Sequence, residues 1–489
     1  MHGDGIDPAT AVAIIVNACM GMGFLSLPYT SVRVGPVVAI FVTLALGAVA
    51  LLTALWTAIA MSLTAALGRP GGDPEVIAWA PLAHDPEPGR PNKDPFNLDT
   101  LVFAAYTEMV RALFGDCAWR LASWALCVAL LVVMWAYAAL VAGTLSAMVP
   151  VPYVGGPCDI YDEEDSGCQR VYQAYLLVFG LVGVALSSYS FKEQRHFQIV
   201  MSAARLLLVL SIIGDCARMH VMGEAPPPPG GDSVGHAPGR SAVQSYNPTA
   251  FPSLPSPTAF KPVALPNHVA VAMAALTVHM IIPEALKDLD DKPRNMLPTV
   301  GCALALCIVV YVLVSASVAF TFGDWTKPVC TLNWVHYTAG RPAAGWGAVL
   351  FRSWLLIVPT VDVTGAYPVL ATALASTMRP CFPSTDGSWQ LRVACALLPV
   401  VGAAVVSDLP YLLGCVGLCM LLFVFILPPI MILRAESLCL RHFGAQALYS
   451  STYWRWHCDR RITSSLLALG ILVTLAATPS VLGFEKMLF

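Results

Sequence analysis

The stretch NACMGMGFLSLPY, Asn17 to Tyr29, lies in the first long apolar segment of the chain and carries Gly21, Gly23 and Pro28 near its centre. Glycine and proline are the residues that weaken a helix most. In lipid every backbone amide and carbonyl must find a partner, so weak positions in a membrane helix need a reason. One reason is close packing, since glycine lets two helix backbones approach. The other is a discontinuous helix whose freed backbone groups line a binding site.

The composition indicates a membrane protein. Of the 489 residues, 57% are hydrophobic and 12% are charged, whereas a soluble domain carries about 25% charged residues. The net charge of −3 and the lack of a basic block argue against nucleic-acid binding. The first apolar segment follows the acidic start MHGDGIDP, so we interpret it as a retained helix rather than a signal peptide.

Apolar runs of about 20 residues are long enough to cross a bilayer as helices. The sequence contains about eleven of them, which predicts an all-α polytopic membrane protein. The predicted spans cover residues 9–30, 35–67, 116–149, 170–190, 197–220, 267–287, 298–322, 345–377, 391–407, 410–434 and 462–483.

A second weak segment decides between the two interpretations of the first. Five spans after Gly21 and Gly23 comes VAMAALTVHMIIPEALKDLDD, in which His279 is followed by Pro283 and Glu284. Paired discontinuous helices, in corresponding positions of two inverted repeats, are typical of secondary transporters. We therefore predict two inverted five-helix repeats plus one extra helix.

The predicted organisation is a single transmembrane transporter domain over residues 1–489. The first five-helix repeat covers 8–222 and the second covers 267–434. A Pro-, Gly- and Ser-rich outer loop, 223–266, is expected to be disordered, and 435–489 holds a basic cytoplasmic loop and the eleventh helix. Most of the 27 Lys and Arg residues fall on one side if the N-terminus is cytoplasmic and the C-terminus outer or luminal. The pattern does not distinguish the plasma membrane from an endolysosomal membrane.

Both weak segments resemble the amino acid/auxin permease (amino acid transporter transmembrane) family. The first matches its pattern N-x-x-x-G-x-G-x-L-x-x-P, and the second continues through YVLVSASVAFTFGD as that family does. The resemblance extends over nearly the whole chain and is closest to the transmembrane protein 104 branch, through residues 172–205, 351–374 and 407–417. It implies eleven spans, a leucine-transporter-like 5+5 inverted repeat, and movement of amino acids with protons or sodium.

The two breaks predict the substrate site. Freed amides at the N-terminus of a half-helix suit an anion such as an amino acid carboxylate. We expect Gly21, Met22 and Gly23 to hold that carboxylate, with His279 and Met280 lining the pocket. The alternative for His279 is that a neighbouring side chain simply satisfies the imidazole.

Asp362, in the apolar run VPTVDVTG, is the predicted coupling residue. Placing an aspartate at mid-membrane costs about 2.5–3.5 kcal/mol on insertion scales, which marks it as functional. Sodium-coupled members of the resembling family have a threonine at the matching position, so we expect protons as the coupling ion, with sodium as the alternative. Thr364 is the predicted hydroxyl partner of Asp362, and Asn17 a predicted oxygen ligand. The alternatives are a structural hydrogen bond from Asp362 to the first helix and an interhelical hydrogen bond for Asn17.

Together these features predict a secondary active transporter of amino acids or similar small zwitterions, working by alternating access, with no cofactor, no metal and no enzymatic activity. The alternative is a non-transporting amino acid sensor of the same fold. The expected partners are the small-molecule substrate and the lipid bilayer. Cys158, Cys168 and Cys330 fall in polar outer loops and predict a disulfide among the three, with its pairing open.

Overall fold

The structure is a computed structural model, and it is described for residues 6–21, 23–67, 106–161, 166–187, 195–224, 260–286, 289–339, 345–379, 389–443 and 459–482. These residues are helices and short connections, with two isolated backbone bridges in place of any sheet. The prediction of an all-α protein is confirmed. Most of the predicted outer loop 223–266 and part of the segment 435–489 lie outside the described residues, so their character stays a prediction.

Eight helical segments in the described ranges are long and apolar enough to cross a membrane. They are α3 (Pro36–Leu67), α5 (Tyr106–Met148), α6 (Ser166–Ser187), α7 (Arg195–Met222), α10 (Lys292–Phe322), α11 (Trp346–Met378), the run α13 (Leu409–Leu421) to α14 (Leu427–Phe443) with a π-helical turn between them, and α15 (Arg460–Val481). The pair α1 (Pro8–Cys19) and α2 (Gly23–Val34), bent by 55°, adds a ninth.

Two predicted spans correspond to shorter helices. Residues 391–407 match α12 (Trp389–Val405), and 267–287 match α8 (Leu265–Ala275) followed by α9 (Ile282–Leu286). The polytopic architecture is therefore confirmed, while the count of eleven spans stays a prediction.

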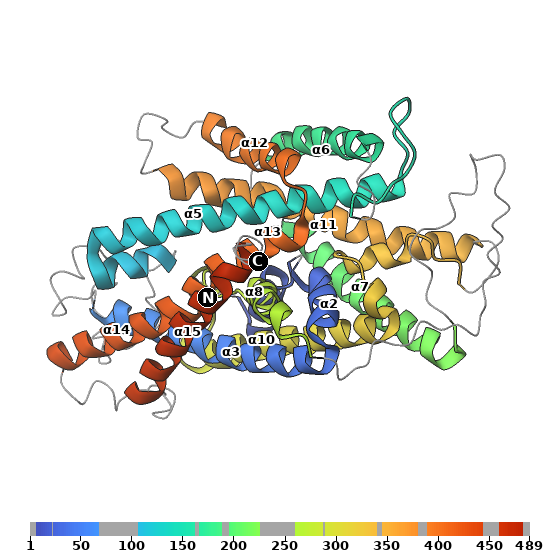
Figure 1. Cartoon of the computed structure of the whole chain (residues 1–489). Coiled ribbons are helices and arrows are strands. Elements are labelled where there is room, and N and C mark those ends of the chain that lie inside the picture. Colours follow the sequence, from blue (N-terminus) through green and yellow to red (C-terminus); the bar gives the residue numbers. More distant parts are fainter. Residues whose placement is uncertain are drawn as a thin grey trace, which may run out of the picture.

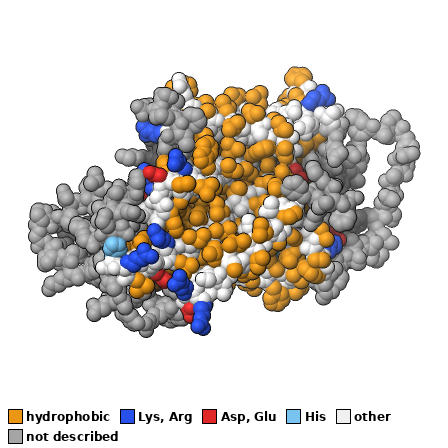
Figure 2. All heavy atoms as spheres, turned by 60° about the vertical axis from the view of Figure 1, so that its left-hand side comes forward, with side chains coloured by type: hydrophobic (Ala, Val, Ile, Leu, Met, Phe, Trp, Pro, Cys, Tyr) orange, Lys and Arg blue, Asp and Glu red, His pale blue; other side chains and the backbone are white. Residues whose placement is uncertain are grey.

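The broken helices lie at the centre of the bundle. In Figure 1, α6 and α12 lie along one side of the long helix α5, and α3 and α10 lie beyond the opposite side. Between these layers are α2, α8 and α13, and α8 packs against α13 and α2. An apolar belt covers the face in Figure 2, with Lys and Arg gathered mainly toward one end. This distribution is that of a protein whose middle lies in lipid.

The end of the molecule where α7 finishes is held by polar contacts between loops. A disulfide joins Cys158 to Cys168, whereas Cys330 is a free, buried thiol. Lys327 Nζ lies 3.0 Å from Asp159 Oδ2. The disulfide ties the connection after α5 to the start of α6, and the ion pair ties the same connection to the one after α10.

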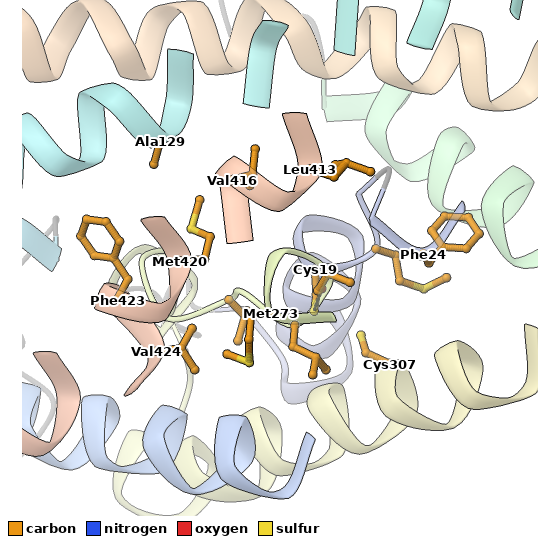
Figure 3. Packing of buried hydrophobic residues seen from close by; sticks show 14 of the residues in the cluster. Cys19, Phe24, Ala129, Met273, Cys307, Leu413, Val416, Met420, Phe423 and Val424 are labelled. Carbon is orange, nitrogen blue, oxygen red and sulfur yellow. Dashed lines mark hydrogen bonds between the residues drawn. The ribbon is translucent and has the colours of Figure 1, made fainter. Parts of the chain in front are cut away.

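The closest backbone approach in the core joins α13 to α8. A Cβ atom added to Gly417 would lie 1.9 Å from the carbonyl oxygen of Ala270. Figure 3 shows α13, with Leu413, Val416 and Met420, between Ala129 of α5 and Met273 of α8. Because only a residue without a side chain fits at 417, α8 can rest directly on α13.

We expect Gly417→Ala to destabilise the protein by about 3 kcal/mol or more, because the methyl group meets a backbone carbonyl that cannot move alone. Gly301→Ala is the matched control, since a Cβ there meets nothing within 4 Å and alanine favours a helix by about 0.5–1 kcal/mol over glycine. Thermal unfolding of both purified variants measures the difference. Equal melting temperatures would contradict the close packing.

Candidate functional site

The first predicted break is present between α1 and α2. Helix α1 begins after Asp7, whose carboxylate accepts hydrogen bonds from Ala9 N, Thr10 N and the Thr10 hydroxyl. The hydroxyl of Thr10 is the largest cause of the lowered pKa of Asp7. The helix ends at Cys19, where Gly21 N turns back to donate to the Cys19 carbonyl at 2.8 Å. Met22 lies outside the described residues, so its predicted role in substrate binding stays a prediction.

The second predicted break is present between α8 and α9. Helix α8 stops at Ala275, residues 276–281 form turns, and α9 resumes at Ile282. Pro283 stands in the first turn of α9, where its missing N–H leaves no helix hydrogen bond unmade. The proline therefore starts a new helix instead of kinking a continuous one.

One tyrosine hydroxyl lies within hydrogen-bonding distance of the last carbonyl oxygens of both half-helices. Tyr311 Oη of α10 lies 2.8 Å from the Cys19 carbonyl oxygen and 2.9 Å from the Ala275 carbonyl oxygen. Each of these carbonyls ends a helix and lacks an intrahelical donor. The Cys19 thiol adds a weak bond to the Ala275 carbonyl at 3.4 Å. The ends of α1 and α8 therefore meet at a single point, in the region shown in Figure 3.

Gly23 fits both interpretations offered by the sequence. It begins α2, and a Cβ atom there would lie 2.8 Å from the Cα of Ala275. Glycine thus allows the start of one half-helix to touch the end of the other. Gly21, two residues earlier, allows a similar close approach to α5. A Cβ atom added to Gly21 would lie 3.1 Å from the Tyr137 hydroxyl oxygen.

His279 is fully buried at the second break and contacts α3. Its Nε2 lies 2.9 Å from the Thr53 hydroxyl, which itself donates to the Val49 carbonyl at 2.9 Å. Because that hydroxyl has one proton, Nε2 must donate to Thr53. This contact is the one expected if a neighbouring side chain satisfies the His279 imidazole, which was the alternative to a role in lining the substrate pocket. Met280, the next residue, is half-buried against the apolar core.

Asp362 of α11 is paired with an arginine that the sequence analysis did not select. The Nε and Nη2 atoms of Arg205, in α7, lie 3.0 and 2.7 Å from Asp362 Oδ2, and Nη2 lies 2.6 Å from Oδ1. Nη1 of the same guanidinium donates to the Asn17 carbonyl at 2.6 Å and to Asn17 Oδ1 at 2.7 Å. Arg205 therefore joins α1, α7 and α11 in a single cluster.

Two other predictions for this cluster have different outcomes. Asn17 contributes two oxygens, although to a guanidinium rather than to a free cation. The Thr364 hydroxyl donates to the Thr360 carbonyl of its own helix at 2.6 Å, so it is not the partner seen for Asp362. A signal for Arg205 was present, because an arginine inside an apolar run is as costly as an aspartate and equally marks function. Arg205 is only 6% exposed.

Two cavities bear on the site. Gly21, Arg205 and Asp362 are among the residues that line an internal cavity of about 10 Å³, which is room for about one water molecule. A larger cavity, of about 830 Å³, lies at the end of the molecule where α2 finishes and α8 begins. Its charged lining side chains are Arg33, Lys261, Asp324 and Asp408. The described residues therefore leave space for a small zwitterion in the larger cavity but not beside the Arg205–Asp362 ion pair.

A protein-family model matches most of the chain. The family model described as "Transmembrane amino acid transporter protein" matches residues 99–449. No curated protein sequence matches the chain. The matched region includes Arg205, Asp362 and the whole second broken helix, and it leaves the transmembrane protein 104 branch as a prediction.

We expect Tyr311→Phe to lower the stability by about 1–3 kcal/mol, because the buried Cys19 and Ala275 carbonyls lose the hydroxyl proton that they share and keep, among the described residues, only the Gly21 amide and the weak Cys19 thiol as donors. Tyr367→Phe is the matched control: its hydroxyl bonds the Ala396 carbonyl at 2.6 Å, which lies inside α12 and keeps its helix partner. Thermal unfolding should show the larger loss for Tyr311→Phe, and amide exchange should quicken in the last turns of α1 and α8. Equal losses with unchanged exchange would show that Tyr311 does not hold the two ends.

Proposed function

The chain belongs to the transmembrane amino acid transporter family, and from this we propose that it is a proton-coupled secondary active transporter that moves an amino acid or similar small zwitterion by alternating access. Membership of the family and the apolar helices make it an integral multi-pass membrane protein. A transporter of this family is not expected to be an enzyme. The coupling and the mechanism are our proposal.

The observation that carries the proposal is the meeting of two interrupted helices in the middle of the bundle. Tyr311 bonds the last carbonyls of α1 and α8, and Gly23 packs on Ala275. Interrupted helices at mid-membrane are where secondary transporters bind their substrates and coupling ions. This arrangement supports a leucine-transporter-like fold.

We assign the substrate carboxylate to the start of α2. The N–H groups at a helix N-terminus have no intrahelical acceptors, and the helix dipole favours an anion there. In the described state the Tyr137 hydroxyl covers Gly21, 3.1 Å from where a Cβ atom would lie, so we propose that the carboxylate enters only when these helices move apart. Since the His279 imidazole contacts Thr53, we assign it to holding the second break in place.

We assign proton coupling to the Arg205–Asp362 pair. A proton that reaches the Asp362 carboxylate neutralises it and removes most of its attraction for the guanidinium. Arg205 is then free to release Asn17, and with it the end of α1. Protonation of one residue in α11 is thereby linked to movement of the half-helix that binds the substrate.

Alternating access requires that the ends of the half-helices separate. At the N-terminal end of α1, Ile6 forms a backbone bridge with Leu289, and Asp290 N donates to the Ile6 carbonyl at 3.0 Å. These bonds join the segment before α1 to the segment after α9. The large cavity lies at the opposite ends of α2 and α8. We propose that the described state is closed on the Ile6 side, which we take as cytoplasmic.

Uptake into liposomes tests the transport proposal. We expect purified protein to take up a labelled amino acid mixture faster when an inward proton gradient is imposed, with sodium absent. Failure to transport under either condition, or after sodium is added, while binding is retained, would favour the amino acid sensor of the same fold.

Asp362→Asn tests the coupling. We expect uptake by this variant to lose its dependence on the proton gradient, because the amide cannot take up the proton. Asp116→Asn is the matched control, since it removes a partly exposed ion pair with Arg111 in α5, which is worth about 0–1 kcal/mol. Unchanged gradient dependence in Asp362→Asn would rule out the assigned role.

A further inference from the structure

Four oxygen atoms from two helices converge on the Arg205 guanidinium. They are the carbonyl and side-chain oxygens of Asn17 and both carboxylate oxygens of Asp362, all within 2.6–3.0 Å of a guanidinium nitrogen. The amide four residues after Asn17, Gly21 N, donates to the Cys19 carbonyl instead of to the Asn17 carbonyl, which accepts from Arg205. The break in the first helix thus presents a backbone oxygen to the same point as a carboxylate.

Such a set of oxygens has the chemistry of a site for a monovalent cation. Carbonyls freed at the end of a half-helix, together with side-chain oxygens, coordinate sodium in secondary transporters. Here the charge of the carboxylate is already balanced by the guanidinium, which bonds it through two nitrogens. A second cation placed among these oxygens would meet that positive charge in a buried setting where repulsion is strong.

We infer that Arg205 is a tethered cation: in the described state its guanidinium occupies a monovalent-cation site between α1 and α11, and because it is covalently attached it makes the protein independent of dissolved sodium. The inference deepens the proposed function, on which its consequence for transport rests. The occupation of the site itself stands on the geometry. Arg205 is accordingly a specificity-determining residue for the coupling ion.

Burial and hydrogen bonds hold the Arg205 side chain in this position in the described state. Arg205 is 6% exposed, and its neighbours in the internal cavity include Leu208 and Val358, which surround the guanidinium with apolar groups. Every guanidinium nitrogen has an oxygen partner within 3.0 Å. Removing the side chain leaves the Asp362 carboxylate buried and unpaired, a situation that favours uptake of another cation.

The test measures cation binding without transport. Purified wild-type protein, Arg205→Ala and the control Arg352→Ala are unfolded thermally in potassium, sodium or choline chloride, with and without millimolar guanidinium. Arg352 lies near the start of α11, about ten residues before Asp362, and donates to the Val335 carbonyl at 3.4 Å. For wild type and for Arg352→Ala, we expect a melting temperature that does not depend on which of these salts is present.

We expect Arg205→Ala to melt at a lower temperature and to recover by about 1 °C or more when sodium or guanidinium is present at several times its dissociation constant. Sodium-specific stabilisation of the wild type would overturn the inference. So would an Arg205→Ala protein that responds to no cation.

If Arg205→Ala does not fold, Arg205→Gln keeps most of the side-chain volume and removes the charge, so the same cation response is expected of it. Arg205→Lys retains a tethered charge and should remain insensitive to sodium; a sodium response equal to that of Arg205→Gln would contradict the role of the charge. These measurements separate the two proposals. Liposomes without uptake, together with a cation-responsive Arg205→Ala, would reject transport and leave the tethered cation standing.

Discussion

The structure depends on one constraint: backbone groups freed at a helix break must be satisfied in a region that water does not supply. Each break leaves carbonyls at the end of one half-helix. The Tyr311 hydroxyl serves Cys19 and Ala275, and the Arg205 guanidinium serves Asn17. Both side chains come from helices distant in sequence from the carbonyls they bond. The breaks are therefore stable only inside the assembled bundle.

This constraint also explains why the proposed binding and coupling groups lie close together. A side chain that donates to a freed carbonyl must itself be polar. If that side chain is charged and buried, it also needs a neighbouring group of opposite charge. Arg205 brings Asp362, so a titratable carboxylate from α11 lies within one side chain of the first break. Buried pairs of this kind are weak contributors to stability, because desolvation offsets their attraction. Separating the two partners, by contrast, leaves a charge buried and unpaired and is strongly destabilising.

Much of the fold and part of the site could be predicted from sequence. Apolar runs identified the membrane helices, and Gly21, Gly23 and Pro283 located both breaks. Intramembrane cost identified Asp362, and the same argument would have identified Arg205 had it been applied to the fifth span. It could not have paired the two, because they stand 157 positions apart. Nor could spacing show that Thr364 bonds its own helix, or that Cys158 pairs with Cys168 rather than Cys330.

The sequence by itself determined the class of protein, the position of the helices and the places where two of them are interrupted. These properties follow from local hydrophobicity and local backbone preference, which act over a few residues. Only the tertiary structure decided what the interruptions contact: Tyr311 at the carbonyls, Thr53 at His279, and Arg205 among the oxygens of Asn17 and Asp362. Those partners are chosen by how helices pack across the bundle, and packing brings together residues that no local pattern relates.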